Sequence, residues 1–176
     1  YAGKVPELIT HPFADENGAL KFDEKDFEKI DGVNAVAFGM GCGVSENTYE
    51  IARRLLKNFK GVLLIDADGL NSLAAFGVKA LKNSGADVVV TPHVKEFSRL
   101  TGRSVEEIEN DMIGSAKAFA KEYGVTVLLK SAVSVVAGKE GVLLNTTGNS
   151  GMAKGGSGDV LSGAVAGIAA RGFPAF

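Results

Sequence analysis

The chain has 176 residues, which is enough for one ordinary domain with a hydrophobic core and gives no reason to expect a second. Its formal net charge is −2 and its basic residues are scattered, which argues against a nucleic-acid backbone or an anionic membrane as partner. The one cysteine, Cys42, excludes an intrachain disulfide, and no apolar run approaches the roughly 20 residues that span a bilayer, so we predict a cytoplasmic protein.

Short apolar runs along the chain are predicted to form buried strands. The first polar segment, residues 11–31, contains Asn17-Gly18, a pair that favours a tight turn, so we expect a loop or hairpin there. The predicted strands then occupy residues 35–38, 62–65, 88–90, 126–129 and 134–137.

Helical spacing of apolar residues lies between most of these strands. It fills residues 46–57 and 104–121, and Ser104 with Glu107 forms a capping-box pattern. A last apolar helix is expected to open at Asp159. Because apolar strands alternate with helices, we predict an α/β fold with a mostly parallel central sheet and helices on both faces. Ligands of such sheets bind beyond the carboxyl ends of the strands.

The most informative segment is the glycine-rich loop over residues 149–159, NSGMAKGGSGD. Its GGSG part, residues 155–158, directly precedes the last predicted helix, whose first amides lack partners inside the helix. Glycines let those amides approach phosphate oxygens, the helix dipole favours an anion, and Lys154 could add a full charge. The pattern is not a Walker loop, which would end in Gly-Lys-Ser/Thr. We predict a phosphate site here; the alternative is a flexible loop followed by a capping Asp159.

Asp159 itself has two interpretations. A carboxylate beside a phosphate is repelled by it, which favours a role in handling a proton: a general base that accepts the proton of a substrate hydroxyl during phosphoryl transfer. As an N-cap, Asp159 would instead contribute about 1 kcal/mol of stability and take no part in chemistry. The adjacent loop favours the general base.

Polar residues follow two of the predicted strands at the same edge of the sheet. Asp66, Asp68 and Asn71 come after residues 62–65, and they could assist Mg²⁺ or bind a hydroxyl. For Asp68 and Asn71, a capped turn is an equally good alternative. His93 and Glu96 come after residues 88–90 and are expected to face the same rim, where His93 could be functional or structural.

Two further strand ends contribute weaker signals. Residues 39–43, GMGCG, follow the first strand, and their glycines suit either close approach to a ligand or a tight turn. Cys42 in this loop is interpreted as a packing residue, because no base is marked beside it. Lys130 and Ser131 end another strand at the same edge and could meet either a nucleotide phosphate or solvent.

Five strings occur in order along the chain: GMGCG, IDADGLN, TPHVKEF, LLKS and GNSGMAKGGSGDVLSG. Together they resemble the ADP- or ATP-dependent NAD(P)H-hydrate dehydratases of the ribokinase-like superfamily. The resemblance implies a ribokinase-like fold and a repair reaction on the S-epimer of hydrated NADH or NADPH. The nucleotide phosphorylates the hydroxyl on the nicotinamide ring, and loss of phosphate restores the double bond.

The resemblance also implies roles for individual residues. Asp159 would be the base at the hydrate hydroxyl, and Gly41, His93 and Asn149 would join it in binding the hydrated dinucleotide. The residues implied at the phosphate donor are Lys130, Ser131, Ala132, Val133, Ser134, Gly155, Gly156, Ser157 and Gly158. ADP is expected as the donor in preference to ATP, with Mg²⁺, in a homo-oligomer that the resemblance suggests is a tetramer.

This chain departs from the family pattern in a few places. The family has other residues at positions 40, 42, 94, 95 and 131, where this chain has Met40, Cys42, Val94, Lys95 and Ser131. None of these differences removes a charge that the mechanism needs. The sequence does not begin with Met, its first six residues lack the apolar stretch of a signal peptide, and it stops just after a predicted helix. We therefore expect residues 1–176 to be a single domain that lacks parts at both ends.

Two other functions are open from the sequence. A vitamin-precursor kinase of the same superfamily would use the same loop and the same Asp159 for a stable phosphoryl transfer. A nucleotide-binding module without catalysis would need only the loop.

Overall fold

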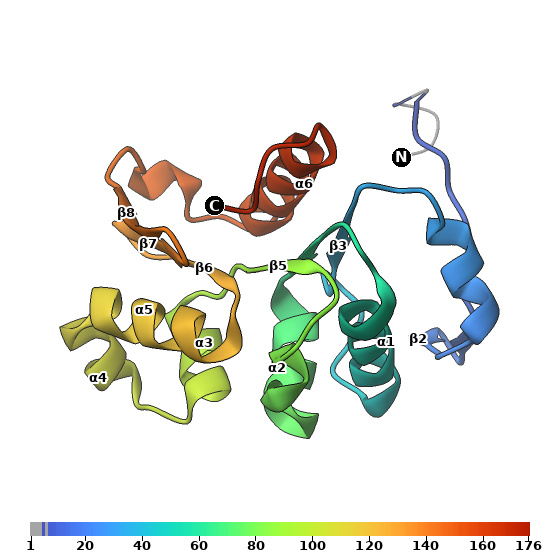
Figure 1. Ribbon diagram of the computed structural model, residues 1–176, viewed down its shortest axis with the longest axis horizontal. Coiled ribbons are helices and arrows are strands. Elements are labelled where there is room, and N and C mark those ends of the chain that lie inside the picture. The colour runs from blue at the N-terminus through green and yellow to red at the C-terminus, as the bar shows by residue number, and fades with distance from the viewer. Residues whose placement is uncertain (1–4, 6) are drawn as a thin grey trace.

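The computed structural model describes residue 5 and residues 7–176. Residues 1–4 and 6, which carry most of the expectation that a signal peptide is absent, lie outside this part. One six-stranded sheet organises the chain, with its strands in sequence order (Figure 1). Its strands are β3 (Ala35–Phe38), β4 (Val62–Ile65), β5 (Asp87–Val90), β6 (Thr126–Leu129), β7 (Ser134–Gly138) and β8 (Gly141–Asn145).

The pairing divides the sheet into two parts. Strands β3, β4, β5 and β6 are parallel, and β6, β7 and β8 are antiparallel to one another in turn. Parallel neighbours need helical crossovers, whereas β7 and β8 are joined by a short turn, as expected for an antiparallel pair. The prediction of a mostly parallel sheet is confirmed. Strand β8 was not predicted, because its apolar residues stand next to a polar segment and the strand lies at the edge of the sheet.

Nine helical segments are present in the described part of the chain. The α-helices are α1 (Glu46–Asn58), α2 (Ala67–Phe76), α3 (Val94–Thr101), α4 (Val105–Asn110), α5 (Met112–Tyr123) and α6 (Ser157–Ala170). The 3-10 helices are η1 (Glu24–Ile30), η2 (Val78–Leu81) and η3 (Ser150–Met152). None of the described helices is both long and apolar enough to cross a bilayer.

The two faces of the sheet are covered unequally. Helices α1 to α5 lie on one face, and α6 lies on the other, where it packs against β3 and β4 (Figure 1). The prediction of helices on both faces therefore holds, but the α6 face is covered by one helix only. Beyond α6, the same face carries the strand ends and the loop that form the candidate site.

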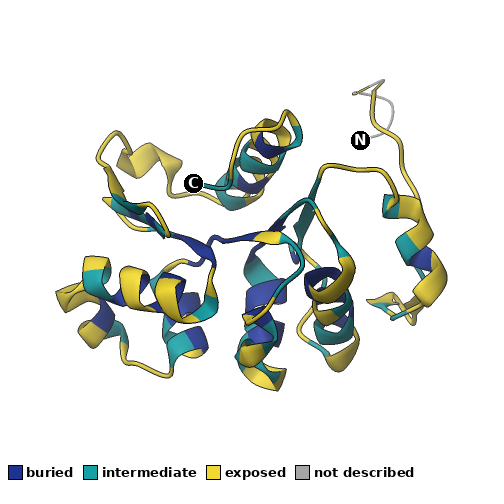
Figure 2. Cartoon of the chain, viewed as in Figure 1, coloured by how far each residue is buried: buried dark blue, intermediate teal, exposed yellow. Residues whose placement is uncertain are grey.

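The main core lies between the sheet and helices α1 to α5. Side chains of a strand alternate between faces, so Leu63 and Ile65 join this core, whereas Leu64 points to the α6 side; all three are fully buried. Phe97 of α3 packs edge-to-face on Phe119 of α5, with ring centroids 5.3 Å apart. Figure 2 shows that the buried residues concentrate in the strands and on the inner sides of these helices.

The structure tests two local predictions, the helix over residues 104–121 and the hairpin near Asn17-Gly18. The helix expected over residues 104–121 is divided into α4 and α5 at Asp111, whose Oδ1 accepts from the Gly114 amide at 2.8 Å and caps α5. An aspartate can compete in this way with the helical backbone, and so it ends one helix and starts another. The hairpin expected near Asn17-Gly18 is present as β1 (Asp15–Glu16) and β2 (Ala19–Leu20), with positive φ at both turn residues.

Candidate functional site

A cavity of about 1020 Å³ opens on the α6 face of the sheet, beyond the end of β6. The ends of β6, β7 and β8, residues 148–155 and the start of α6 surround it. Nine residues predicted for the site line it: His93, Lys130, Ser131, Ala132, Ser134, Asn149, Gly155, Ser157 and Gly158. Residues that follow β5 and β6 thus meet the glycine-rich loop at one place, as predicted, whereas the predicted residues that follow β3 and β4 do not line the cavity.

Other predicted residues do not line this cavity. These are Gly41, Asp66, Asp68, Asn71, Glu96, Val133, Gly156 and Asp159. Conversely, sequence reasoning missed the apolar floor, which consists of Leu128 on β6, Val136 on β7 and Leu161 on α6. Leu128 and Val136 are direct cross-strand partners, and Leu128 lies between two residues of the main core, Val127 and Leu129. Their alternation along the strand was the signal that could have found them.

The glycine-rich loop ends in a helix start without a side-chain cap. The N-cap of α6 is Gly156, with φ 86° and ψ −13°, and no side chain accepts a hydrogen bond from the first turn. The loop itself is ordered by Asn149, whose Oδ1 accepts from the Gly151 amide at 2.9 Å and caps η3. Uncapped amides at a helix N-terminus are suited to an anion, which supports the predicted phosphate site.

Asp159 is not the N-cap of α6, so that alternative is wrong. It is the third residue of the helix, it is exposed, and none of the described residues makes a hydrogen bond or ion pair with its carboxylate. It follows directly after Ser157 and Gly158, which line the cavity. The carboxylate is therefore not engaged by any described residue, and the positive end of the helix dipole favours its charge.

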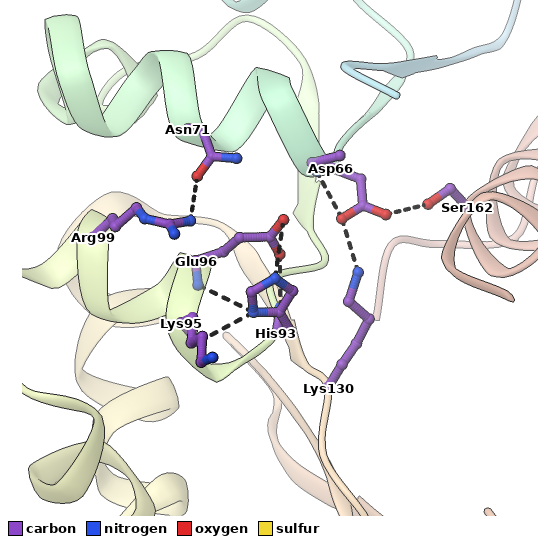
Figure 3. Close-up of polar contacts among 9 residues, drawn as sticks. Asp66, Asn71, His93, Lys95, Glu96, Arg99, Lys130 and Ser162 are labelled. Carbon is purple, nitrogen blue, oxygen red and sulfur yellow. Dashed lines mark hydrogen bonds and ion pairs between the residues drawn. The ribbon is translucent and has the colours of Figure 1, made fainter. Parts of the chain in front are cut away.

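Asp66 is the centre of a buried polar network beside the cavity (Figure 3). The residue is 3% exposed, and both carboxylate oxygens accept hydrogen bonds. Oδ1 accepts from the Lys130 ammonium at 2.9 Å and from the Ala67 amide at 2.9 Å, and Oδ2 accepts from the Ser162 hydroxyl at 2.8 Å. Asp66 therefore caps α2 and holds β6 and α6, and its oxygens are not free to bind a metal ion.

His93 and Glu96 form a reciprocal cap at the start of α3 (Figure 3). His93 Nδ1 accepts from the amides of Lys95 and Glu96 at 3.1 and 3.2 Å, and Glu96 Oε2 accepts from the His93 amide at 2.9 Å. An Nδ1 that accepts carries no proton, so the neutral imidazole is protonated at Nε2. His93 is half-exposed at the cavity, with its Nε2 3.5 Å from Glu96 Oε1. The histidine therefore combines a structural role with a polar group at the site.

The other acidic and amide residues of the predicted rim are also engaged. Asp68 Oδ2 accepts from the Gly43 amide at 2.9 Å, and Asn71 Oδ1 accepts from the Arg99 guanidinium at 2.9 Å. Neither residue caps α2, since Asp66 does so. Among the described residues, no group of three histidine, cysteine or acidic side chains is placed to hold a metal ion.

The loop over residues 39–43 is explained by its backbone. Gly39, Gly41 and Gly43 all have positive φ, and a Cβ at Gly39 would lie 2.1 Å from the Asp66 carbonyl oxygen. Glycine is therefore required here whether or not a ligand binds. Burial raises the pKa of the Cys42 thiol, which agrees with its interpretation as a packing residue.

Residues 1–173 match the family model described as NAD(P)H-hydrate dehydratase. The chain belongs to the NAD(P)H-hydrate dehydratase family. The resemblance that the five strings suggest is thereby confirmed, and all five lie within the matched residues.

Relatives of this dehydratase-family chain agree with the match. The bifunctional NAD(P)H-hydrate repair enzyme Nnr of Moorella thermoacetica is 37% identical over 175 residues, which are 97% of this chain and 33% of the relative. The ADP/ATP-dependent NAD(P)H-hydrate dehydratase of Bacillus subtilis, crystallised with ATP and Mg²⁺, is 30% identical with a TM-score of 0.67 over 78% of this chain and 48% of that one. The chain thus spans about a third of the curated relative and about half of the solved structure.

A more distant structure shares the fold. The hydroxyethylthiazole kinase of Pyrococcus horikoshii has a TM-score of 0.67 at 19% identity, over 89% of this chain and 63% of that one. At this identity the likeness shows the fold alone. The α/β fold of this dehydratase-family chain is ribokinase-like, as the sequence predicts.

Proposed function

We propose that the protein dehydrates the S-epimer of hydrated NADH or NADPH, with ADP as the phosphate donor. Membership of the dehydratase family supports the reaction. The observation that carries the proposal is the arrangement of the site. Lys130, Ser131, Ala132 and Ser134 meet the uncapped start of α6 in one cavity, and Asp159, which follows the lining residue Gly158, has no partner among the described residues.

In this proposal Asp159 is the general base. It accepts the proton of the ring hydroxyl as that oxygen attacks the terminal phosphoryl group of the donor. The amides of residues 155–158 stabilise the charge on the transferred phosphoryl oxygens, because no side chain caps this helix end; the Ser157 amide, which donates to the Lys154 carbonyl at 3.3 Å, exchanges that bond for one to the phosphoryl group. Cleavage of the ring C–O bond then releases phosphate, the neighbouring ring carbon gives up a proton, and the double bond is restored.

The donor nucleotide is placed along the end of β6 and the turn that follows. The residues proposed to contact its AMP part are Lys130, Ser131, Ala132, Val133 and Ser134, together with Gly158. Support comes from the apolar floor of Leu128 and Val136, which offers apolar contact to a nucleotide base next to these polar groups. Lys130, held by Asp66, brings a positive charge to the phosphate end of the site.

The proposed contacts of the hydrated dinucleotide are Gly41, His93, Asn149 and Asp159, of which His93 and Asn149 line the same cavity as Lys130. Because Nδ1 of His93 is occupied by the cap of α3, the histidine would offer its Nε2–H as a donor to the substrate and would not act as a base. This division leaves the proton of the hydroxyl to Asp159.

Magnesium is proposed to arrive with the nucleotide. The Bacillus subtilis relative was crystallised with ATP and Mg²⁺. In this chain the described acidic residues form no three-ligand group, and the Asp66 oxygens are already bonded. The residues therefore do not build a protein-only magnesium site, and no step is assigned to the ion. ADP remains the proposed donor, with ATP as the alternative.

We further propose that residues 1–176 act as one ribokinase-like domain and that the protein works in the cytoplasm. The protein is also proposed to assemble as a homo-oligomer, and a tetramer is expected. Light scattering during gel filtration would test the assembly. A mass corresponding to a monomer at micromolar concentration would overturn it.

The reaction is tested with the protein as its gene encodes it. The protein is incubated with hydrated NADH and ADP, and the absorbance band of reduced nicotinamide is followed. Recovery of this band that requires ADP is expected. If a vitamin alcohol is phosphorylated and no NADH is recovered, the protein is a kinase; if nucleotide binds and nothing turns over, it is a binding module.

A further inference from the structure

We propose that Asp66 is a positioning residue of the phosphoryl-transfer site, with Ser162 as its partner on α6. The inference rests on the proposed function. Asp66 holds the Lys130 ammonium and the first turns of α6 in a fixed relation to each other. It does not contact the substrate, because its side chain is 4% exposed and does not line the cavity.

The network joins parts of the chain that are far apart in sequence. Lys130 is 64 residues from Asp66, and Ser162 is 96 residues from it. Helix α6 packs on β3 and β4, whereas Lys130 follows β6, and β5 separates β4 from β6 in the sheet. The Asp66 carboxylate therefore links α6, which carries the amides, to Lys130, which carries the ammonium (Figure 3).

Gly158 shows how close this network lies to the amide end of α6. A Cβ at Gly158 would lie 3.8 Å from both Asp66 Oδ2 and the Lys130 ammonium nitrogen. Ser162 is one turn further along the same helix and is fully buried. Its bond to Asp66 therefore fixes the rotation of α6 directly below the amides proposed to bind phosphate.

Electrostatics make the carboxylate hard to replace. Without it, the Ser162 hydroxyl would be buried without its acceptor, and Lys130 would lose its counter-charge while its side chain is only 23% exposed. A lysine side chain is long and flexible, so an unpaired Lys130 would turn towards water and away from the helix start. Groups displaced by about 1 Å from the productive geometry can lower the rate on the order of 100-fold.

The test uses Asp66→Asn and Ser162→Ala in the protein as its gene encodes it. Three quantities are measured: kcat for the ADP-dependent reaction, the affinity for AMP by calorimetry, and the thermal unfolding transition. AMP has no transferable phosphoryl group, so its affinity reports the nucleotide site without the transfer geometry. Glu50→Gln, which removes an exposed ion pair with Arg53 on α1, is the matched control and should leave all three unchanged.

We expect Asp66→Asn to lower kcat on the order of 100-fold and to weaken AMP binding as well, because Lys130 is a proposed AMP contact; Ser162→Ala, which keeps the Asp66–Lys130 pair, should lower kcat about tenfold with AMP affinity within threefold of wild type. A structural role alone would lower the unfolding temperature and leave kcat per folded molecule unchanged. If Asp66→Asn does not fold, Ser162→Ala decides, because it keeps the ion pair to Lys130. A kcat within twofold of wild type for Ser162→Ala would overturn the inference.

Failure of the proposed function would look different. A wild-type protein that phosphorylates a vitamin alcohol and leaves hydrated NADH unchanged would refute the dehydratase. The same two variants measured on that phosphoryl transfer would still test Asp66.

Discussion

Two adjacent glycines in the loop before α6 carry different requirements, and alanine substitutions should separate them. Gly156 has φ 86°, a conformation that costs an alanine about 1–2 kcal/mol. Gly155 does not have a positive φ, and a Cβ there would meet nothing within 4 Å. The fold therefore requires glycine at 156 and does not require it at 155. If glycine at 155 serves the close approach of a phosphate, its replacement should affect binding alone.

The expected results follow from these values. Gly156→Ala should lower the free energy of unfolding by about 1–2 kcal/mol, which corresponds to roughly 2–8 °C in a protein of this size. Gly155→Ala should leave it unchanged or raise it by up to about 1 kcal/mol, since alanine has fewer unfolded conformations. Its affinity for ADP should fall at least about tenfold, because a methyl group would occupy the approach of the phosphate to the amides.

Urea unfolding and calorimetry with ADP measure the two effects separately. Gly163→Ala is the matched control: the glycine lies on the exposed side of α6, and its Cβ would meet nothing within 4 Å. This change should stabilise the helix by about 1 kcal/mol and leave ADP affinity unchanged. Wild-type ADP affinity in Gly155→Ala would refute the reasoning that phosphate binds at this loop.

Two further predictions concern the polar groups of the site. Asp159→Asn should lower turnover at least about 100-fold while ADP binding persists, because the amide keeps the shape of the carboxylate and cannot accept the proton. Turnover assays and calorimetric titration with ADP measure these two effects. Retained turnover would exclude Asp159 as the base. His93→Ala should destabilise the protein by about 1 kcal/mol through loss of the α3 cap, whereas His93→Asn should keep the cap. Both His93 variants should raise KM for the hydrate, and an unchanged KM in His93→Asn would show that Nε2–H does not bind it.

Most strands of the sheet could be predicted from the sequence, because a buried parallel strand needs a continuous apolar run. Strands β3, β4 and β6 have the predicted bounds, and β5 and β7 differ by one residue. The meeting of the residues after β5 and β6 at one cavity also followed from the sequence, since parallel strands place their carboxyl ends at one edge, but the residues after β3 and β4 do not line it. The start of α6 was predicted within two residues, at Asp159 where the structure has Ser157, and the alternative that Asp159 is the N-cap is wrong because Gly156 occupies that position.

The roles of the polar residues at that edge were decided by the tertiary structure. Asp66 was a candidate for assisting a metal, and it is the buried acceptor for Lys130 and Ser162. Glu96 was a candidate rim residue, and it caps α3 together with His93. A carboxylate next to a strand end looks the same in the sequence whether it faces a ligand or a lysine 64 residues away.

The sequence by itself determined the order of the predicted strands and helices and the place of the glycine-rich loop directly before α6. These features depend on local patterns: apolar runs, helical spacing and glycines before a helix. Only the tertiary structure decided which acidic groups are free. Asp159 has no partner among the described residues and Asp66 has three, because partners from β6 and α6 reach Asp66 only after the chain has folded.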